Sequence, residues 1–335
     1  MRFSFPLLVS DIGGTHIRSG LARAPDAPLA EGPRLKTRDF PGLEAALAAT
    51  AAAIGVKPKS LIACAAGPVE GRSVKMTNAD WRIDGHSVAI AAGLEQGLLL
   101  NDFEAQAFSL VELDERFARP IGFFEKKPGL QLIMGLGTGL GTAALAKIDG
   151  RALVLPSEAG HMDLGPVGPQ EEAFWPALDK TPRDRICVES LLSGHGLFRL
   201  HQARCKTAGK AARIADEVAL IEQAAADPEG EEGETLRLCW TLTARIAGDL
   251  ALAFLAKGGV TLAGGILPRI LLFCDPDQFR ATFENKAPYG ELLQAIGTRL
   301  ITSEEAVLKG MAAIAAAPQN YAIDYGSRAW CDYGA

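Results

Sequence analysis

Two glycine-rich segments, each lying between two apolar segments of strand length, constrain this chain more than any other feature of its sequence. The first, at residues 11–15, reads Asp-Ile-Gly-Gly-Thr and separates the apolar residues 7–10 from the alternating residues 16–22. The second, at residues 135–141, contains four glycines and is flanked in the same way. Such segments favour a tight turn between two strands. Because both halves of the chain open alike, the sequence predicts a weak internal repeat and two related lobes.

Composition argues against several classes of protein. A chain of 335 residues, 48% of them hydrophobic, has enough apolar material for two domains of ordinary size. The formal net charge is −6 and there is no basic block, so we expect no nucleic-acid partner and no membrane attachment. The N-terminus lacks the features of a signal peptide, which predicts a cytoplasmic protein. The six cysteines form no C-x-x-C pair, which argues against a disulfide scaffold and a zinc site.

The apolar pattern predicts mixed α/β structure in both halves. Strands are expected at residues 7–10, 16–22, 61–66, 74–76, 98–100, 130–135, 142–146, 260–263 and 299–302. Helices are expected at residues 43–54, 87–92, 103–111, 171–178, 184–192, 211–225 and 233–256, after residue 267, and at residues 303–316 with Ser303 as N-cap. Residues 112–129 are charged and rich in glycine and proline, which indicates a domain boundary. Beyond residue 318, aromatic side chains indicate a tail that docks on a surface: Tyr321, Tyr325, Trp330 and Tyr333.

The glycine segments are candidate nucleotide sites. Backbone N–H groups of the turn at residues 11–15 could cradle phosphate oxygens, Thr15 adds a hydroxyl, and Asp11 could hold a water molecule on a metal ion. An ordinary hairpin turn explains this segment equally well. The segment at residues 135–141 is neither a dinucleotide fingerprint nor a P-loop, and a second phosphate-binding turn explains its glycines better than a plain turn does. Gly264-Gly265 leaves room for a flat adenosine group, although alone a packing role explains the pair better.

Three acidic residues and one histidine are candidates for the chemistry. Asp102 follows a predicted buried strand, where open α/β sheets bind ligands, and its carboxylate could take the proton of an attacking hydroxyl. The competing interpretation of Asn101-Asp102 is a helix N-cap. Glu158 and His161 suit adjacent hydroxyl groups of a sugar, and no third ligand makes them a metal site. Glu189, a charge among apolar residues, is by itself more typical of a solvated helix face.

Taken in order, these segments resemble the bacterial glucokinase family over nearly the whole chain, from about residue 7 to about residue 316. The matching residues are 11–15 with Arg18, Met76-Thr77-Asn78 with Trp81, Asn101-Asp102-Phe103, residues 137–141, Leu155-Pro156 with Glu158, Gly160-His161 and Asp163, Glu189 with Leu192-Ser193-Gly194 and Gly196, and residues 263–266 with Pro268-Arg269. The sequence departs from the family pattern at Ser10, where glycine is usual, at His16, where asparagine is usual, and at residues 157–160, which are usually richer in glycine.

The resemblance implies a fold, an activity and a set of roles. The fold is the two-lobed actin-like ATPase (ribonuclease H-like) fold, with a small α/β domain (residues 1–112 and 303–318), a larger α+β domain (residues 113–302), a cleft between them, and a tail (residues 319–335). The activity is phosphorylation of D-glucose on its 6-hydroxyl by ATP and Mg²⁺, with Asp102 as general base. Sugar-binding positions are Asn78, Asn101, Asp102, Glu158, His161 and Glu189. Nucleotide-binding positions are Ser10, Asp11, Ile12, Gly13, Gly14, Thr15, Gly137, Thr138, Gly139, Gly264 and Gly265.

The resemblance further implies a glycolytic homodimer whose lobes close over the sugar, which would exclude competing water. No residue is expected to ligate the metal ion directly. A kinase for another hexose, such as mannose or an N-acetylhexosamine, remains an alternative, as does a donor other than ATP, such as ADP or polyphosphate. A non-catalytic sugar-sensing regulator is the alternative from another class, against which stand the negative charge and the absence of a preceding helix-turn-helix pattern. The cysteine-rich zinc motif of the other branch of sugar kinases and repressors is also absent.

Overall fold

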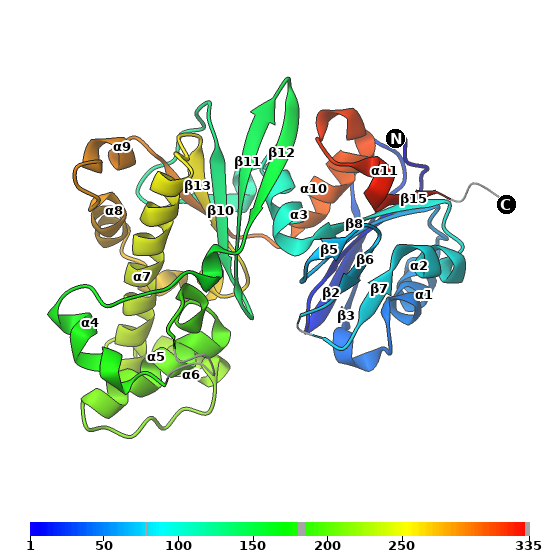
Figure 1. Cartoon of the computed structure of the whole chain (residues 1–335). Helices are drawn as coiled ribbons and strands as arrows, with labels where there is room; N and C mark the ends of the chain where they lie inside the picture. The colour runs from blue at the N-terminus through cyan, green and yellow to red at the C-terminus, as the bar shows by residue number, and fades with distance from the viewer. Residues whose placement is uncertain (78, 180–184, 332–335) are drawn as a thin grey trace. The chain divides into compact units, whose positions relative to one another are not determined.

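A computed structural model describes residues 1–77, 79–179 and 185–331 of the chain (Figure 1). The chain divides into two compact units. The first comprises Met1–Phe117, Leu145–Leu155 and Ser303–Ala335, and the second comprises Ala118–Ala144 and Pro156–Thr302. Each unit is therefore built from segments far apart in the sequence.

A six-stranded mixed sheet forms the centre of the first unit, in the order β15-β8-β4-β1-β2-β3. Its strands are β1 (Leu7–Ile12), β2 (His16–Ala22), β3 (Ala30–Lys36), β4 (Ser60–Ala65), β8 (Gln96–Asn101) and β15 (Ala329–Cys331). Strands β1, β4 and β8 are parallel neighbours, whereas β2, β3 and β15 pair antiparallel. The whole of β1 and β4 is buried, as expected for central parallel strands covered on both faces. The carboxyl ends of β1, β4 and β8 therefore meet at one edge of the sheet.

Helices cover both faces of this sheet (Figure 1). They are α1 (Leu43–Ile54), α2 (Gly85–Ala92), α3 (Asp102–Ser109), α10 (Glu305–Ala316) and the short α11 (Tyr325–Arg328). Helix α1 packs against α2, and α3 packs against α10. The alanine-rich helix α1 ends at Gly55, which adopts the left-handed conformation (φ 69°) and donates its N–H to the Ala51 carbonyl. A small three-stranded sheet completes the unit: β5 (Val69–Glu70), β6 (Ser73–Lys75) and β7 (Arg82–Asp84).

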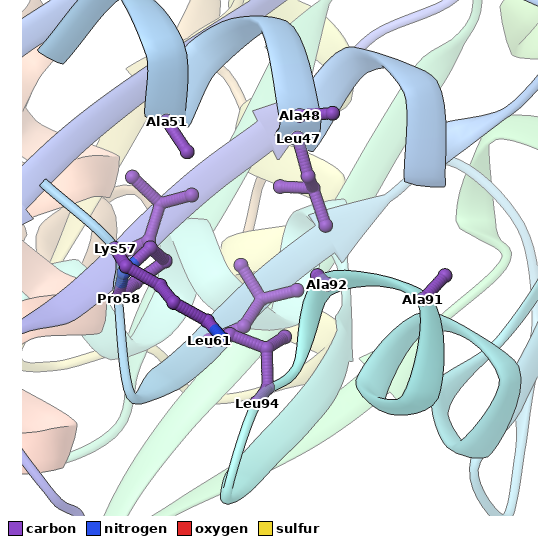
Figure 2. Close-up of a pocket in the computed structure, with 10 residues that line it drawn as sticks. Leu47, Ala48, Ala51, Lys57, Pro58, Leu61, Ala91, Ala92 and Leu94 are labelled. Atoms are coloured by element: carbon purple, nitrogen blue, oxygen red, sulfur yellow. The ribbon is translucent and has the colours of Figure 1, made fainter. Parts of the chain in front are cut away.

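A small apolar cavity of about 150 Å³ lies between α1, α2 and the sheet (Figure 2). Nine apolar residues and the side chain of Lys57 line it. Leu8 and Leu61, which face it, precede Asp11 and Cys64 by three residues, about 10 Å along an extended strand. The cavity thus lies away from the polar carboxyl ends of the strands, and its lining offers carbon where a sugar needs hydrogen-bonding groups.

The sheet of the second unit has the order β12-β11-β10-β13-β14-β9. Its strands are β9 (Ala118–Pro120), β10 (Gln131–Leu136), β11 (Leu140–Ile148), β12 (Arg151–Ser157), β13 (Gly259–Ala263) and β14 (Thr298–Ile301). Strands β10, β13 and β14 are parallel, and β9 pairs antiparallel with β14. The end of β11 and the start of β12 cluster with the first unit.

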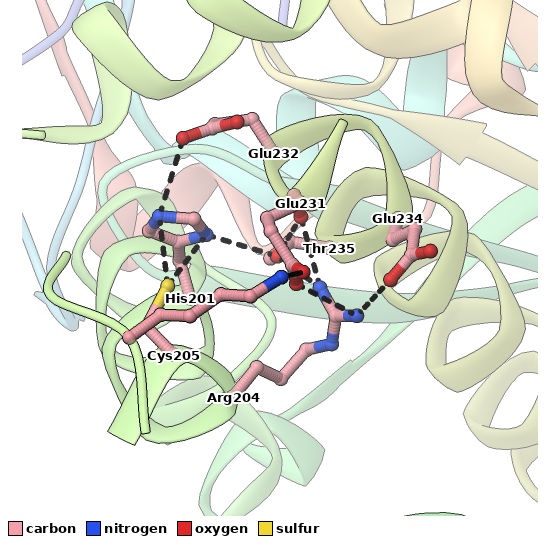
Figure 3. Close-up of polar contacts among 8 residues, drawn as sticks. His201, Arg204, Cys205, Glu231, Glu232, Glu234 and Thr235 are labelled. Atoms are coloured by element: carbon pink, nitrogen blue, oxygen red, sulfur yellow. Dashed lines mark hydrogen bonds and ion pairs between the residues drawn. The ribbon is translucent and has the colours of Figure 1, made fainter. Parts of the chain in front are cut away.

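The helices of the second unit are α4 (Pro169–Phe174), α5 (Gly194–Thr207), α6 (Glu217–Ala226), α7 (Glu231–Ala253), α8 (Pro276–Glu284) and α9 (Gly290–Gln294). Helix α7 packs against α5, α6 and α8. Buried polar groups join α5 to α7 (Figure 3). There, His201 Nδ1 lies 3.1 Å from Thr235 Oγ1, and Cys205 Sγ lies 3.4 Å from His201 Nε2. Among the described residues, no three or more His, Cys, Asp or Glu side chains are grouped so that they could hold a metal ion. The described helices include none with the length and hydropathy of a membrane-spanning segment.

Most of the predicted elements are confirmed, and four expectations need correction. The helix predicted at residues 211–225 begins only at Glu217, because residues 211–216 are irregular and Asp216 caps the helix by accepting the N–H of Ala219. The helix predicted at residues 184–192 is wrong: residue 184 lies outside the described residues, and Val188–Ser190 forms a single 3₁₀ turn. Helix α5, which was not predicted from the sequence, begins after Ser193, whose Oγ accepts the N–H of Gly196. The segment after residue 267 is likewise a 3₁₀ helix, Leu267–Phe273, rather than an α-helix. Helix α10 begins at Glu305, two residues after the predicted start at residue 303, and Glu304 takes the N-cap position predicted for Ser303. Ser303 Oγ still accepts the N–H of Glu305.

The docking of the aromatic tail is confirmed as far as Trp330. Strand β15 adds to the edge of β8, and Tyr321 and Trp330 are buried. The ring of Tyr321 packs edge-to-face on Phe108, with 5.4 Å between centroids. Tyr333 lies outside the described residues.

Candidate active site

Three parallel strands of the first unit bring two carboxylates to the same sheet edge. Asp11 of β1 lies opposite Cys64 of β4, and Cys64 lies opposite Leu100 of β8, two residues before Asp102. The Cys64 thiol donates a hydrogen bond of 3.4 Å to Asp11 Oδ1. Burial raises the pKa of Cys64 well above its usual value, and the charges of Asp11 and Asp102 raise it further. Cys64 is therefore a protonated hydrogen-bond donor between the carboxylates and not a nucleophile.

Asn101, and not Asp102, caps helix α3. The Oδ1 atom of Asn101 accepts the N–H groups of Phe103 (2.9 Å) and Glu104 (3.2 Å). Glu104 Oε2 in turn accepts the N–H of Asn101 at 3.3 Å, which completes a capping box. The competing structural role is thus filled by Asn101, and Asp102 stands in the first turn of the helix. The N–H of Phe103 also donates to Asp102 Oδ1 at 3.0 Å, which orients the carboxylate.

Asn101 keeps little spare hydrogen-bonding capacity. Its Nδ2 atom donates to the Gly67 carbonyl at 3.0 Å, while its Oδ1 atom serves the helix cap. One amide N–H is what this side chain can still offer a ligand.

Asp11 is held in an ion-pair network. Its Oδ2 atom pairs with Arg18, whose other guanidinium nitrogen pairs with Glu304 at 2.8 Å, and Arg34 pairs with Glu304 at 3.0 Å. These contacts fix the Asp11 carboxylate and neutralise part of its charge. Mg²⁺ binds through few carboxylates and keeps several of its waters. A carboxylate that already serves Arg18 and Cys64 therefore suits contact with a metal-bound water better than direct ligation.

The first glycine turn joins β1 to β2. The N–H of Gly13 donates to the His16 carbonyl at 2.9 Å, so this amide closes the turn itself. Thr37 ties the turn to the chain that follows: its Oγ1 donates to the Gly13 carbonyl (2.7 Å) and its N–H to the Thr15 carbonyl (3.0 Å). Within the described residues, the N–H groups of Gly14 and Thr15 have no backbone acceptor. Those two amides, and not that of Gly13, are available to an anion.

In the second unit, the second glycine turn is tied to Glu189. Glu189 Oε2 accepts the N–H of Leu140 at 2.8 Å, so Glu189 is a ligand of the turn and not a solvated helix residue. A Cβ atom at Gly139 would lie 2.4 Å from the same oxygen, which explains that glycine. The N–H of Gly194 donates to the Gly137 carbonyl at 2.9 Å. None of the described residues would lie within 4 Å of a Cβ atom at Gly137, so this face of the turn is open.

The loop with Glu158 and His161 packs on the same turn. A Cβ atom at Gly160 would lie 2.4 Å from the Leu140 carbonyl oxygen, so only glycine permits this approach. The loop runs beside the residues before Glu189, because the N–H of Val188 donates to the Met162 carbonyl at 3.0 Å. Glu158 Oε2 and His161 Nε2 are 4.0 Å apart, and 86% and 60% of these side chains are exposed. Glu189 therefore binds the second glycine turn through its side chain, whereas the loop with Glu158 and His161 packs on it through Gly160.

The glycine pair after β13 has two separate explanations. Gly264 has a φ of +90°, and a Cβ atom there would lie 2.2 Å from the Leu136 carbonyl oxygen, so it is a packing glycine. At Gly265 no described residue would come within 4 Å of a Cβ atom. Only the second glycine leaves space for a ligand.

The predicted site residues therefore form two groups. Ser10–Thr15, Asn101 and Asp102 lie in the first unit, and Gly137–Gly139, Glu158, His161, Glu189, Gly264 and Gly265 lie in the second. Ser10 is fully buried, with its Oγ 2.9 Å from Ser19 Oγ, and Ile12 is buried as well, so neither side chain is accessible to a ligand. Asn78 lies outside the described residues. The prediction missed Glu104, although the spacing Asn101-x-x-Glu104 is the signature of a capping box.

Comparison with known proteins identifies the family of this chain. The family model described as Glucokinase matches residues 8–318. The chain belongs to the glucokinase family. The glucokinase of Sinorhizobium medicae (strain WSM419) is 36% identical over 330 residues, covering 98% of this chain and 97% of that protein.

Two solved structures share the fold. The crystal structure of glucokinase from an Antarctic psychrotroph has a TM-score of 0.79 and 29% identity, and the match covers 92% of this chain and 98% of that one. A ROK family glucokinase from Streptomyces griseus, in complex with glucose and AMPPNP, has a TM-score of 0.66 and 21% identity over 91% and 97% of the chains. The two-lobed sugar kinase fold class predicted from the sequence is confirmed. All candidate site residues fall within the family match, whereas α11 and β15 follow its end.

Proposed function

We propose that this glucokinase family member transfers the γ-phosphoryl group of ATP to the 6-hydroxyl of D-glucose, giving glucose 6-phosphate and ADP. The match over residues 8–318 and the 36% identity to a glucokinase over nearly full length support the activity. The glucose and AMPPNP bound to the Streptomyces griseus glucokinase support the sugar and the adenine nucleotide.

In this proposal Asp102 is the general base. As the bond between O6 and the γ-phosphorus forms, the 6-hydroxyl proton moves to the Asp102 carboxylate. The bond between the γ-phosphorus and the bridging oxygen breaks, and ADP leaves with that electron pair. The observation that carries this role is the capping of α3 by Asn101 and Glu104, because it removes the helix-cap explanation for Asp102. The Phe103 N–H holds one carboxylate oxygen in place.

Nucleotide binding is assigned to the two glycine turns and Gly265. The N–H groups of Gly14 and Thr15 donate to phosphate oxygens, and Gly137 and Gly265 let the nucleotide approach the backbone closely. Mg²⁺ bound with ATP would neutralise phosphate charge during the transfer. Asp11, fixed by Arg18, would hold that ion through one of its waters.

Sugar binding is assigned to Asn101 and Asp102 and to Glu158, His161 and Glu189. The carboxylates accept hydrogen bonds from sugar hydroxyls, and the remaining side-chain N–H of Asn101 donates one. The His161 ring can donate or accept a hydrogen bond. Because Glu189 also binds the Leu140 N–H, it couples sugar binding to the shape of the second glycine turn. A cytoplasmic homodimer stays a prediction.

The direct test replaces the base and a matched carboxylate elsewhere. Asp102→Asn should lower kcat by about 10²- to 10⁴-fold while the KM for glucose changes little. Asp84→Asn is the control, because Asp84 caps helix α2 in the same unit and asparagine caps equally well. A near-wild-type kcat for Asp102→Asn in an ADP-release assay would refute the assignment. Turnover by the wild type is also measured for glucose, mannose and N-acetylglucosamine, each with ATP, ADP and polyphosphate. Faster turnover of another sugar or another donor would favour the corresponding alternative kinase. Sequence-specific DNA binding in a gel-shift assay would favour a regulator.

A further inference from the structure

The segment that follows the family match docks beside the proposed base. Strand β15 pairs antiparallel with β8, placing Trp330 opposite Gly97. A Cβ atom at Gly97 would lie 1.9 Å from the Trp330 ring, and one at Gly85 would lie 2.4 Å from it. The indole therefore occupies a slot that two glycines provide, and only 2% of Trp330 is exposed. This slot fixes the register of the tail on β8, the strand that leads into Asn101 and Asp102.

Arg328 uses this register to reach the capping box of α3. Its two terminal nitrogens bind the two oxygens of Glu104, each at 2.7 Å. One of them also donates to the Leu99 carbonyl at 3.0 Å. The side chains of Arg328 and Glu104 are 19% and 14% exposed. A bidentate pair shielded in this way holds a carboxylate in both position and orientation.

Glu104 passes this constraint to the site. Its Oε2 atom accepts the N–H of Asn101, and Asn101 Oδ1 accepts the N–H groups of Phe103 and Glu104. The N–H of Phe103 also holds Asp102 Oδ1. A continuous set of hydrogen bonds therefore leads from Arg328 through Glu104 and Asn101 to the backbone that carries Asp102.

Other contacts already anchor the tail. Trp330 fills its slot, β15 pairs with β8, and the Tyr325 hydroxyl donates to the Pro318 carbonyl at 3.0 Å. Arg328 adds a partly buried cation whose buried Nε finds no acceptor among the described residues, which is costly for an anchor. Its contacts with both the strand end and the cap suit the orientation of α3 better than the attachment of the tail.

We propose that Arg328 is a positioning residue that sets the orientation of Asp102 through Glu104 and the capping box of α3. This inference rests on the proposed function of Asp102 as general base. The tail thereby becomes part of the kinase machinery, although it lies beyond the residues that the family model matches.

The test compares Arg328→Met, Arg328→Lys, Glu104→Gln and the double variant Arg328→Met/Glu104→Gln in the full chain. Arg328→Met should lower kcat by about 10- to 100-fold with an unchanged KM for ATP, because small displacements of a reacting group have effects of this size. Arg328→Lys should recover only part of this loss, since an ammonium group cannot pair with both oxygens of Glu104. The double variant should lose no more than Arg328→Met alone, because both changes break the same set of bonds.

Tyr325→Phe is the control for attachment of the tail, since it removes an anchoring hydrogen bond and leaves the pair of Arg328 with Glu104 in place. It should keep wild-type kcat. Wild-type kcat in Arg328→Met, or losses that multiply in the double variant, would overturn the inference. If the wild type is active and Asp102→Asn is inactive, either of these two results would overturn only the role of Arg328 and would leave the proposed function intact.

A second measurement does not depend on activity. The N–H groups of Phe103 and Glu104 donate to Asn101 Oδ1, so their hydrogen exchange reports on the cap. In Arg328→Met these amides should exchange at least about tenfold faster than in the wild type and in Tyr325→Phe. Equal protection in all three proteins would refute the positioning role even if the wild type proved to have no kinase activity.

Discussion

Gly139 offers a test of the link between the second glycine turn and the sugar. A Cβ atom at this position would lie 2.4 Å from Glu189 Oε2 and 3.1 Å from Glu189 Cδ. Carbon and oxygen in ordinary contact are about 3.3 Å apart. The substitution Gly139→Ala therefore forces the carboxylate back by roughly 0.9 Å. The Glu189 Oε2 to Leu140 N distance, now 2.8 Å, would then exceed the about 3.2 Å limit of a good hydrogen bond.

The expected size follows from the bond that is lost. A hydrogen bond to a charged group contributes about 1.5–3 kcal/mol. If Glu189 loses its fixed orientation and its sugar contact to this extent, the KM for glucose should rise about 10- to 150-fold, since 1.4 kcal/mol corresponds to a factor of ten. The KM for ATP should change far less, because the Cβ atom is directed at Glu189.

The assay is steady-state ADP release over a matrix of glucose and ATP concentrations. Gly137→Ala, in the same turn, is the matched comparison. No described residue would lie within 4 Å of its Cβ atom, so it should spare the KM for glucose and raise that for ATP if a phosphate approaches there. A Gly139→Ala enzyme with the wild-type KM for glucose, or one in which both KM values rise equally, would refute the argument.

Two further predictions concern stability. Gly97→Ala places a Cβ atom 1.9 Å from the Trp330 ring and should lower the free energy of unfolding, measured in urea, by about 1–3 kcal/mol. Gly290→Ala is the control, because its Cβ atom would lie no nearer than 3.5 Å to another residue, and equal stabilities of the two variants would contradict the tight fit of Trp330 against Gly97. Burial lowers the pKa of His201, so below about pH 6.5 the unfolded chain binds a proton that the folded chain takes up only at lower pH, and stability falls as the pH drops through this window. His201→Gln should reduce the difference in unfolding free energy between pH 7.5 and pH 5.5, and an unchanged difference would show that His201 is not its source.

Where local patterns decide the structure, the sequence predicted it well. Residues 43–54 form a helix with the predicted bounds, because a run of alanines ends at a glycine that can adopt the left-handed conformation. The strands on either side of the first glycine turn were also predicted, because apolar segments of strand length flank a glycine pair that favours a turn. The place of Asp102 directly after a buried strand was also predicted, at the sheet edge where open α/β sheets bind ligands.

The failures arise where distant contacts override a local pattern. Gly194 and Gly196 weaken the helical pattern at the start of α5, yet a Cβ atom at Gly196 would lie 2.6 Å from the Leu191 carbonyl carbon, so packing demands glycine there. Strand β3 contains Pro33, which is tolerated because β3 is an edge strand. The hydrogen bond of Glu189 to the Leu140 N–H cannot be predicted from the local sequence. The same holds for the pairing of Arg328 with Glu104, 224 positions earlier.

Strand β15 also bears on the aggregation expected of a shortened chain. It covers the outer backbone of β8, whose parallel partner β4 is buried throughout. A chain cut at residue 318, where the family match ends, would present β8 as a bare edge with the apolar run Leu98-Leu99-Leu100, which is a template for strand addition between molecules. Three tail residues thus protect this edge against aggregation, and a chain that ends at residue 318 would lose that protection.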